Sequence, residues 1–255
     1  MTLALYLVPE LDPQLGPGDV VELEGAEARH AASAKRLVIG EHVLLADGQG
    51  AIVEVVAVSV QPERIRFEIR TRGFDPEPDP RFVVVQALPK GDRADLAVES
   101  LTELGVDEIV PWSASRSISV WRDADKIDKG VTKWRRTARE AAKQSRRARI
   151  PTVAGLASTP DIAALIAASD AAFVLHESAT RSLAQCPLPK TGAIVLVVGP
   201  EGGVSEQELQ AFGDAGAAVV RLGDTVLRTS TAGAAGLAVL SVSTGRWNQP
   251  ANVAT

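Results

Sequence analysis

The sequence has very little cysteine and no long hydrophobic run, and each shortage excludes a class of protein. Its 255 residues include one cysteine, Cys186, which cannot form an internal disulfide. A disulfide-stabilised secreted domain is therefore excluded, and a reducing cytoplasm fits. The longest aliphatic run, residues 193–198, is far shorter than the ~20 residues that cross a bilayer. The apolar run at the start stops at Pro9 and follows no basic segment, so we expect no signal peptide.

Metal ligands and an excess of positive charge are also missing. His30, His42 and His176 are scattered along the chain, and with a single cysteine they predict no metal site. The 27 basic and 32 acidic side chains give a net charge of −5. As an average, this value argues against a nucleic-acid partner, because phosphate-binding domains usually carry an excess of Lys and Arg.

The residues that are present follow two patterns, and the first covers residues 1–73. Short β-type runs occur there at 3–8, 19–23, 42–46, 51–60 and 64–70. The last run alternates apolar and charged side chains, which predicts a half-buried strand. A helix is expected at 26–37, so the predicted fold is a small β-barrel or sandwich with one helix. Residues 74–81 alternate prolines with acids, which is typical of a semi-rigid linker.

From residue 82 onward, strands and helices alternate. Strands are predicted at 82–88, 108–111, 172–175, 193–198 and 217–222, and helices at 93–104, 133–149, 162–168, 205–214 and 232–242. Repeated strand–helix units predict a parallel sheet that is covered by helices on both faces. In such sheets, ligands bind at the carboxyl ends of the strands.

A glycine-rich turn follows the predicted strand at 193–198. It reads Gly-Pro-Glu-Gly-Gly over residues 199–203 and leads to Ser205 and Glu208, whose spacing predicts a capping box. Its glycines would let a ligand approach the backbone closely. The spacing matches neither a P-loop nor the Gly-x-Gly-x-x-Gly dinucleotide motif. Glycine content alone is equally compatible with a ligand site and with an unliganded tight turn.

A second turn of this kind follows the next strand, at residues 222–232. It contains Gly223, then Arg228, then a cluster of three hydroxyl residues that opens an Ala/Gly-rich helix. Taken alone, Arg228 is best interpreted as a surface side chain beside a helix N-cap. Gly233 and Gly236 predict close packing of that helix, in a core or in an interface.

Positive charge is concentrated in residues 133–149. This segment holds eight basic side chains and one acid, a net +7, so the rest of the chain carries −12. Solvated helix faces normally mix both signs, whereas this one does not, and a basic helix of this kind indicates phosphate binding. Lys90 and Arg93, just after the strand at 82–88, could reach an anion or remain solvated.

Together these motifs resemble those of a known enzyme family. Segments 198–208 (Val-Gly-Pro-Glu-Gly-Gly-Val-Ser-x-x-Glu) and 222–232 (Leu-Gly-x-x-Val-Leu-Arg-Thr-x-Thr-Ala) resemble the knotted SPOUT class of S-adenosylmethionine-dependent RNA methyltransferases. The closer match is the family that methylates N3 of a uridine in 16S (small-subunit) ribosomal RNA. Supporting pieces lie at 90–93, 103–105, 113–117 and 141–151, while 30–37 and 45–48 are similar to that family's N-terminal domain.

The resemblance implies an α/β protein with two domains. These are an N-terminal PUA-like β-barrel that binds RNA (1–73) and, after the linker 74–81, a C-terminal α/β-knot (SPOUT) methyltransferase domain with a parallel sheet (82–255). It implies a cytoplasmic homodimer with S-adenosylmethionine bound in the knot. The implied cofactor-binding residues are Leu175, His176, Val198, Gly199, Pro200, Glu201, Gly202, Gly203, Leu222, Gly223, Val226, Leu227, Arg228 and Thr229. The expected RNA-binding residues are Lys90, Arg93, Arg116, Arg136, Arg139, Lys143, Arg146 and Arg147.

Methylation of uridine N3 needs a proton acceptor and a group that stabilises charge on O2 or O4. Arg228 is the candidate for charge stabilisation. Glu201 is the leading candidate base, although it could equally be a turn acid that binds backbone amides, and His176 is the second candidate. The family usually has Glu where this chain has Ser230, a position we interpret as a helix cap.

Two other functions compete with this hypothesis. The same fold could methylate another RNA position, such as a ribose 2′-hydroxyl. A protein of a different class, a non-catalytic RNA-binding factor for ribosome assembly, would use the second domain only to dimerise. A metabolic phosphate-binding enzyme is disfavoured by the basic helix and the β-rich first domain.

Overall fold

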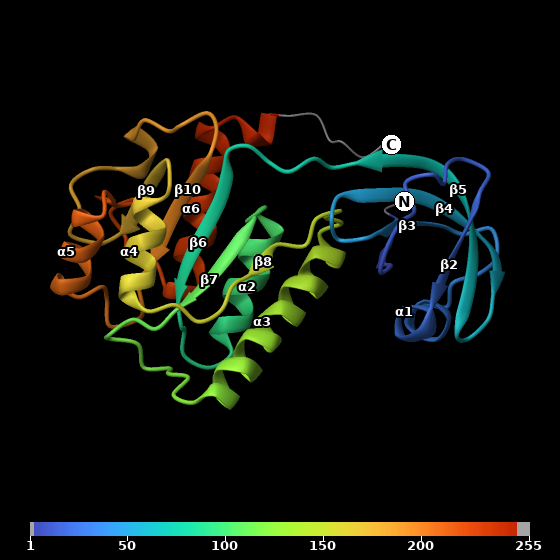
Figure 1. Ribbon diagram of the computed structural model, residues 1–255, viewed down its shortest axis with the longest axis horizontal. Coiled ribbons are helices and arrows are strands. Elements are labelled where there is room, and N and C mark those ends of the chain that lie inside the picture. Colours follow the sequence, from blue (N-terminus) through green and yellow to red (C-terminus); the bar gives the residue numbers. More distant parts are fainter. Residues whose placement is uncertain (1–2, 249–255) are drawn as a thin grey trace. The chain divides into compact units, whose positions relative to one another are not determined.

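The computed structural model describes residues 3–248 and divides by its internal contacts into two compact units (Figure 1). Of the described residues, the first unit contains 3–77 and Ala142–Ile150, and the second contains Pro78–Ala141 and 151–248. The boundary between Glu77 and Pro78 falls inside the predicted linker.

Residues 142–150 were assigned to the second domain from the sequence, but they pack with the first unit. The backbone explains this placement. The N–H of Gly50 donates to the carbonyl of Ala148 (3.2 Å), and the N–H of Ile150 donates to the carbonyl of Gly48 (3.0 Å). Ala148 is buried in an apolar cluster with Leu5, so this return segment completes the first unit's core.

The first unit is built on a curled mixed sheet of five strands in the order β1-β3-β4-β5-β2. The strands are β1 (Leu5–Leu7), β2 (Val20–Glu24), β3 (His42–Ala46), β4 (Ala51–Val60) and β5 (Arg64–Phe74). β1 pairs with β3 in parallel and the other pairs are antiparallel. The edge strands β1 and β2 have no further partner strand in the described residues, so the curled sheet is a half-barrel, and this is the form that the predicted β-rich first domain takes. The alternation predicted at 64–70 is confirmed, since Ile65, Phe67 and Ile69 are buried.

The helix predicted at 26–37 is shorter and changes its geometry partway. α1 (Gly25–Arg29) continues directly into a π-helical turn, η1 (His30–Ala34). Arg36 then adopts a left-handed conformation with φ of +54°, which ends the helical segment.

The second unit has a six-stranded parallel sheet in the order β11-β9-β10-β6-β7-β8. Its strands are β6 (Arg81–Ala87), β7 (Glu108–Trp112), β8 (Thr152–Val153), β9 (Ala171–Leu175), β10 (Ala193–Val198) and β11 (Ala218–Val220). Its helices are α2 (Arg93–Glu103), α3 (Ala124–Gln144), α4 (Thr159–Ala167), α5 (Glu206–Asp214) and α6 (Thr229–Ser243), with short 3₁₀ turns η2 (Leu183–Gln185) and η3 (Arg246–Asn248). The parallel sheet and the α/β class are confirmed; β8, η2 and η3 were not predicted.

Helices cover both faces of this sheet, as predicted (Figure 1). Alternate residues of β6 and β10 point to opposite sides, so Val84 and Leu196 belong to one core while Val83 and Val195 belong to another. The first core is completed by α2, α3 and α6, and the second by α4 and α5. Both central strands are therefore apolar over most of their length, with Arg81 at the start of β6 and Gln86 near its end as the exceptions.

Helix α3 begins nine residues before the predicted start and ends five residues before the predicted end. Arg146 has a φ of +56°. The N–H of Arg147 donates to the carbonyl of Ala142 (2.9 Å), and the N–H of Arg146 donates to that of Lys143 (3.2 Å). These two bonds around a left-handed residue form a Schellman motif, which ends the helix well before Pro151.

Within residues 3–248, no helix combines the length and apolar character needed to cross a membrane. The same residues contain no group of three or more His, Cys, Asp or Glu side chains that could hold a metal ion.

A half-buried ion pair joins the end of the second unit to its first strand. Arg246 donates two hydrogen bonds to Asp107 (2.7 and 2.8 Å), and its guanidinium lies 4.6 Å from the ring centre of Phe82. Asp107 also accepts the N–H of Phe82 (2.8 Å). Three segments that are distant in sequence are thus held by one carboxylate.

We predict that Arg246→Ala lowers the free energy of unfolding by about 3 kcal/mol, because it leaves the carboxylate of Asp107 shielded and short of donors. Arg81→Ala is the matched control: Arg81 pairs with Glu108 at 2.7 Å, but its side chain is exposed, so the loss should be about 0–1 kcal/mol. Urea denaturation of both variants measures the difference. Equal losses would contradict the special role of the Asp107 pair.

Candidate functional site

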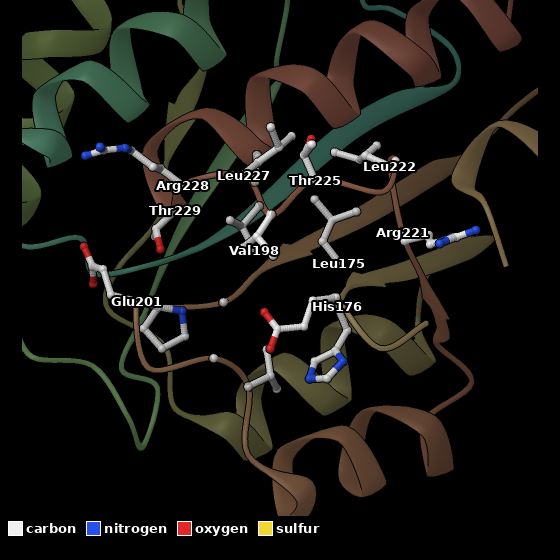
Figure 2. Close-up of a pocket in the computed structure, with 18 of the residues that line it drawn as sticks. Leu175, His176, Val198, Glu201, Arg221, Leu222, Thr225, Leu227, Arg228 and Thr229 are labelled. Carbon is white, nitrogen blue, oxygen red and sulfur yellow. The ribbon is translucent and has the colours of Figure 1, made fainter. Parts of the chain in front are cut away.

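Three strand ends meet on one side of the second unit's sheet. β9, β10 and β11 are parallel neighbours, with Leu175 opposite both Val198 and Val220. The loops that follow these strands surround a pocket of about 340 Å³ (Figure 2). This is the position at which parallel α/β sheets bind ligands, and the volume lies within the range of small-molecule sites.

Most of the predicted cofactor residues line this pocket. Those that line it are Leu175, His176, Val198, Gly199, Pro200, Glu201, Gly203, Leu222, Gly223, Val226, Leu227, Arg228 and Thr229. Gly202 does not line it. The lining residues that we did not predict as cofactor ligands are Arg93, Glu177, Val204, Arg221, Asp224, Thr225 and Ala232. All but Arg93 and Ala232 adjoin predicted positions in the same three loops. They could have been predicted by including the sequence neighbours of the motif residues.

The lining suits a small molecule that carries both apolar and polar groups. Leu175, Val198 and Leu222 supply aliphatic surface, and Figure 2 shows Leu175 and Val198 in the middle of the lining side chains. A Cβ added at Gly223 would meet nothing within 4 Å, so the backbone there leaves room that a ligand can fill. The residues present therefore fit a nucleoside-type cofactor bound through backbone groups and aliphatic contacts.

The turn at 199–203 is held by the capping box that we predicted. Ser205 accepts the N–H of Glu208, and the Glu208 carboxylate accepts the N–H and the hydroxyl of Ser205 (both 2.8 Å). The same carboxylate accepts the N–H of Ser115 (2.7 Å) in the loop after β7. Burial raises the pKa of Glu208, but these backbone and hydroxyl hydrogen bonds outweigh burial and lower it below its ordinary value.

The loop after β7 approaches the glycine turn very closely. Arg116 donates to the carbonyl of Gly202 (3.5 Å), and a Cβ added at Gly202 would lie 2.9 Å from the Arg116 carbonyl oxygen. Gly202 is therefore required by this approach and not by ligand contact. The exposed Arg116 side chain is positioned beside the pocket's turn.

The candidate base Glu201 makes the contact expected of a turn acid. Its Oε1 accepts the N–H of Lys90 (3.1 Å), which joins the turn to the loop after β6. Oε2 has no hydrogen-bond partner in residues 3–248 and lies at the exposed rim of the pocket. Glu201 thus orders a loop and keeps one oxygen available.

His176, the second candidate, is oriented by its own turn. Its Nδ1 lies 2.8 Å from the Ser178 hydroxyl and accepts the N–H of Ser178 (3.3 Å). In Figure 2, His176 and Arg221 lie at one end of the pocket, whereas Arg228 and Glu201 lie at the other. Arg221 is paired with Asp224 at 3.0 Å.

Arg228 is the N-cap residue of α6, and its carbonyl accepts the N–H groups of Thr231 and Ala232 (both 2.9 Å). Its guanidinium is exposed and has no ion-pair partner in the described chain. Our interpretation of Ser230 as a cap was wrong: α6 begins at Thr229, so Ser230 lies inside the first turn and is 4% exposed.

A buried glutamine that we did not predict supports the start of α6. Gln86 is at the end of β6, and its Nε2 donates to the carbonyls of Ala87 (3.0 Å) and Thr229 (3.3 Å). The sequence offered one indication of this role, because Gln86 is the single polar residue in the apolar run 82–88. Gln86 fixes the backbone from which Arg228 extends.

The predicted RNA-binding residues have different surroundings. Lys90, Arg93 and Arg116 are exposed near the pocket, and Arg136 is exposed on α3. Arg139 and Arg147 are half-buried, and Arg146 is exposed. Lys143 differs from this expectation: its side chain is 8% exposed and its ammonium pairs with Glu27 at 2.9 Å, so it does not project from the solvated face of α3.

Comparison with known proteins agrees with this geometry. Residues 76–241 match the model of the RNA methyltransferase domain. The chain is 44% identical over 239 residues to the ribosomal RNA small subunit methyltransferase E of Mycobacterium bovis, covering 92% of this chain and 91% of that protein. It is 26% identical over 247 residues to the protein of that name in Bacillus subtilis, covering 94% and 96%. The fold and the pocket thus define an RNA methyltransferase.

The family can be stated more narrowly. The chain belongs to the family of ribosomal RNA small subunit methyltransferase E. The crystal structure of that enzyme from Neisseria gonorrhoeae, bound to S-adenosylmethionine, is 27% identical to this chain and superimposes with a TM-score of 0.81, covering 94% of this chain and 98% of that one. The α/β-knot fold class inferred from the resemblance is thereby confirmed.

We predict that Gly202→Ala weakens cofactor binding about tenfold, because the added Cβ pushes the turn away from the Arg116 carbonyl and displaces its neighbours in the pocket. Gly213→Ala, in α5, is the control, since its Cβ would meet nothing within 4 Å. Calorimetric titration with S-adenosylmethionine measures both. Wild-type affinity in Gly202→Ala would show that the approach of the two loops does not shape the pocket.

We predict that Glu208→Gln lowers the free energy of unfolding by about 1–3 kcal/mol at pH 7, because a neutral amide replaces a carboxylate that accepts several bonds. Folding lowers the pKa of Glu208 from its ordinary 4.5, so this stabilisation is present above that value and is lost as pH falls through the lower folded value.

Urea denaturation at pH 7 and pH 3 measures this effect, and the difference between wild type and Glu208→Gln should shrink at the lower pH. Glu206→Gln is the control, because Glu206 is exposed in the first turn of the same helix and should change stability very little. A difference that is constant with pH would refute the linkage.

Proposed function

We propose that this protein transfers the methyl group of S-adenosylmethionine to N3 of a uridine in small-subunit ribosomal RNA. The observation that carries the proposal is the pocket at the ends of β9, β10 and β11, lined by the motif residues. Relatives that match more than nine-tenths of the chain are named ribosomal RNA small subunit methyltransferases, and a structural neighbour holds S-adenosylmethionine. A ribosomal substrate also supports a cytoplasmic location.

The three loops would hold the cofactor mainly through backbone groups and aliphatic contacts. Leu175 and Val198 offer apolar surface for the adenine, and the backbone of the turns at 199–203 and 222–229 offers amides and carbonyls to its polar edge and ribose. S-adenosylmethionine supplies an electrophilic methyl group on a sulfonium. The protein's contribution is then to position the acceptor nitrogen in line with that methyl group and to exclude water.

Arg228 and Glu201 are the proposed catalytic residues. Arg228 extends from the rigid start of α6 with its guanidinium unpaired, so it can donate to O2 or O4 of the uracil as negative charge develops there. Glu201 holds Lys90 with one oxygen, and its other oxygen can accept the N3 proton. His176 would then orient its loop through Ser178 and not act as the base.

The proposed RNA contacts are argued from charge and, for Lys90, Arg93, Arg116, Arg136 and Arg146, from exposure as well. Lys90, Arg93 and Arg116 lie around the pocket mouth and would bind phosphates that flank the target nucleotide. Arg136 and Arg139 on α3, and Arg146 and Arg147 after it, would add further phosphate contacts.

We also propose that the protein acts as a homodimer. Val226 is 74% exposed and Leu227 is 39% exposed, although both line the pocket. Apolar side chains that project from a ligand-binding loop favour burial against a second protein surface. A second copy of the chain at this loop would cover them and close the pocket.

The proposed roles predict that Arg228→Ala and Glu201→Gln each lower the rate of methylation by about 100-fold, since each removes one polar group that acts in the transition state. Cofactor affinity should stay close to wild type. Arg221→Ala is the control, because it removes an arginine of the same loop that is already paired with Asp224.

Transfer of labelled methyl to small ribosomal subunits measures the rates, and mass spectrometry of the RNA identifies the modified atom. Full activity in both Arg228→Ala and Glu201→Gln would remove these roles. Methylation at a ribose 2′-hydroxyl would replace the proposed target with the alternative chemistry.

A further inference from the structure

A second cavity lies in the first unit, separate from the pocket at the strand ends. Its volume is about 190 Å³, below the range of about 300–1,000 Å³ that is usual for small-molecule sites. The cavity is formed by the chain around β1, by η1 and the residue after it, and by the last residues of α3 with Arg146 after them. Its lining residues are Leu3, Ala4, Leu5, Tyr6, His30, Lys35, Lys143, Gln144 and Arg146.

This cavity brings together two sequence motifs that the cofactor pocket leaves unused. His30 and Lys35 come from the segment 30–37, and Lys143, Gln144 and Arg146 come from the segment 141–151. The two segments are more than a hundred residues apart, and both carried the family resemblance. Neither contributes a residue to the pocket at the strand ends.

The lining is positively charged. It contains two lysines, one arginine and one histidine, and no carboxylate. Lys35 and Arg146 are exposed and have no ion-pair partner within residues 3–248. Lys143 forms part of the buried wall and is paired with Glu27 at 2.9 Å. This ion pair joins α1 to the end of α3. An anion in this cavity would meet cations at the rim, and the carboxylates that act on Tyr6 from nearby, Glu27 and Glu41, do not line the cavity.

Tyr6 supplies a hydrogen-bond donor in the buried part of the cavity. The side chain is 2% exposed, and its hydroxyl has no partner in the described chain. Burial, with the nearby charges of Glu41 and Glu27, raises the pKa of the Tyr6 phenol, so it keeps its proton at neutral pH. Glu27 forms an ion pair with Lys143, and the carboxylate of Glu41 accepts the N–H of Val38.

The backbone at residue 146 does not account for an arginine there. The Schellman motif holds this residue at a φ of +56°, a conformation that glycine adopts at lower energy than any side-chain-bearing residue. An arginine in this conformation costs about 1 kcal/mol of strain. The side chain therefore needs a reason outside the helix end, and the cavity that it lines provides one.

We propose that this cavity binds a phosphodiester group of the RNA substrate, with Arg146 and Lys35 neutralising its charge and Tyr6 and Gln144 donating hydrogen bonds. The proposal rests on the proposed function to the extent that RNA is the substrate. It adds a defined phosphate site within the first unit, formed by residues that are distant in sequence. Such a contact would position the RNA without reading its bases.

The left-handed backbone makes a clean test available. Arg146→Gly removes the guanidinium at a position where glycine relieves strain, so the variant should fold at least as stably as wild type. Arg36→Gly is a closely matched control: Arg36 is also exposed, has a φ of +54° and carries the same charge, but it does not line the cavity. Both variants change the net charge of the protein by the same amount.

Binding is measured by fluorescence anisotropy with transcribed small-subunit ribosomal RNA at several salt concentrations. Arg146→Gly should weaken binding about fivefold and reduce the slope of log affinity against log salt by about one, as expected for one lost phosphate contact. Arg36→Gly should match wild type in both. Lys35→Ala should behave like Arg146→Gly.

Two outcomes would overturn the cavity site. One is wild-type affinity and slope in Arg146→Gly, and the other is an equal loss in Arg146→Gly and Arg36→Gly, which would indicate diffuse attraction and no defined site. Methylation by the wild-type protein is scored separately. If the wild type methylates the RNA while Arg146→Gly binds normally, the cavity proposal fails and the proposed function stands.

Discussion

The parallel register of β9, β10 and β11 is the constraint on which the site depends. Because Leu175 lies opposite both Val198 and Val220, three chain segments leave the sheet at one level. Each segment must then turn at once, and the turns become the pocket wall. The carboxylate of Glu208 and the amide of Gln86 fix two of these turns to their neighbours. The pairing of these strands therefore determines the shape of the pocket, and a few buried polar contacts stabilise it.

Much of the second unit could be predicted from the sequence, because its signals are local. The run at 193–198 is a strand at those residues, and the Ser205–Glu208 spacing is the capping box that was expected. Both depend only on neighbours along the chain. The motif glycines and their flanking residues likewise gave most of the pocket's lining.

The sequence predictions were wrong where the structure depends on contacts between segments that are distant in the chain. Lys143 follows the pattern of a solvated basic helix, but its partner Glu27 is 116 residues away and buries it. The end of α3 was predicted at Arg149, whereas a Schellman motif at Arg146 ends the helix earlier. Arginine in this left-handed conformation gives no signal in the sequence. Residues 142–150 joined the first unit through backbone pairing with Gly48 and Gly50, which side-chain patterns do not encode.

The long-range closures also determine when the molecule can fold during its synthesis. The first unit is incomplete until residues 142–150 have left the ribosome, even though its sheet ends at residue 74. The contacts of the second unit's first strand are completed later still, because Asp107 and Phe82 both contact Arg246, which is synthesised near the end of the described chain. Nascent chains emerge at about 5–20 residues per second, so the half-barrel waits several seconds for its last segment. Apolar strands of each unit thus stay exposed on the nascent chain until that unit's later segment emerges, first at 142–150 and then at Arg246.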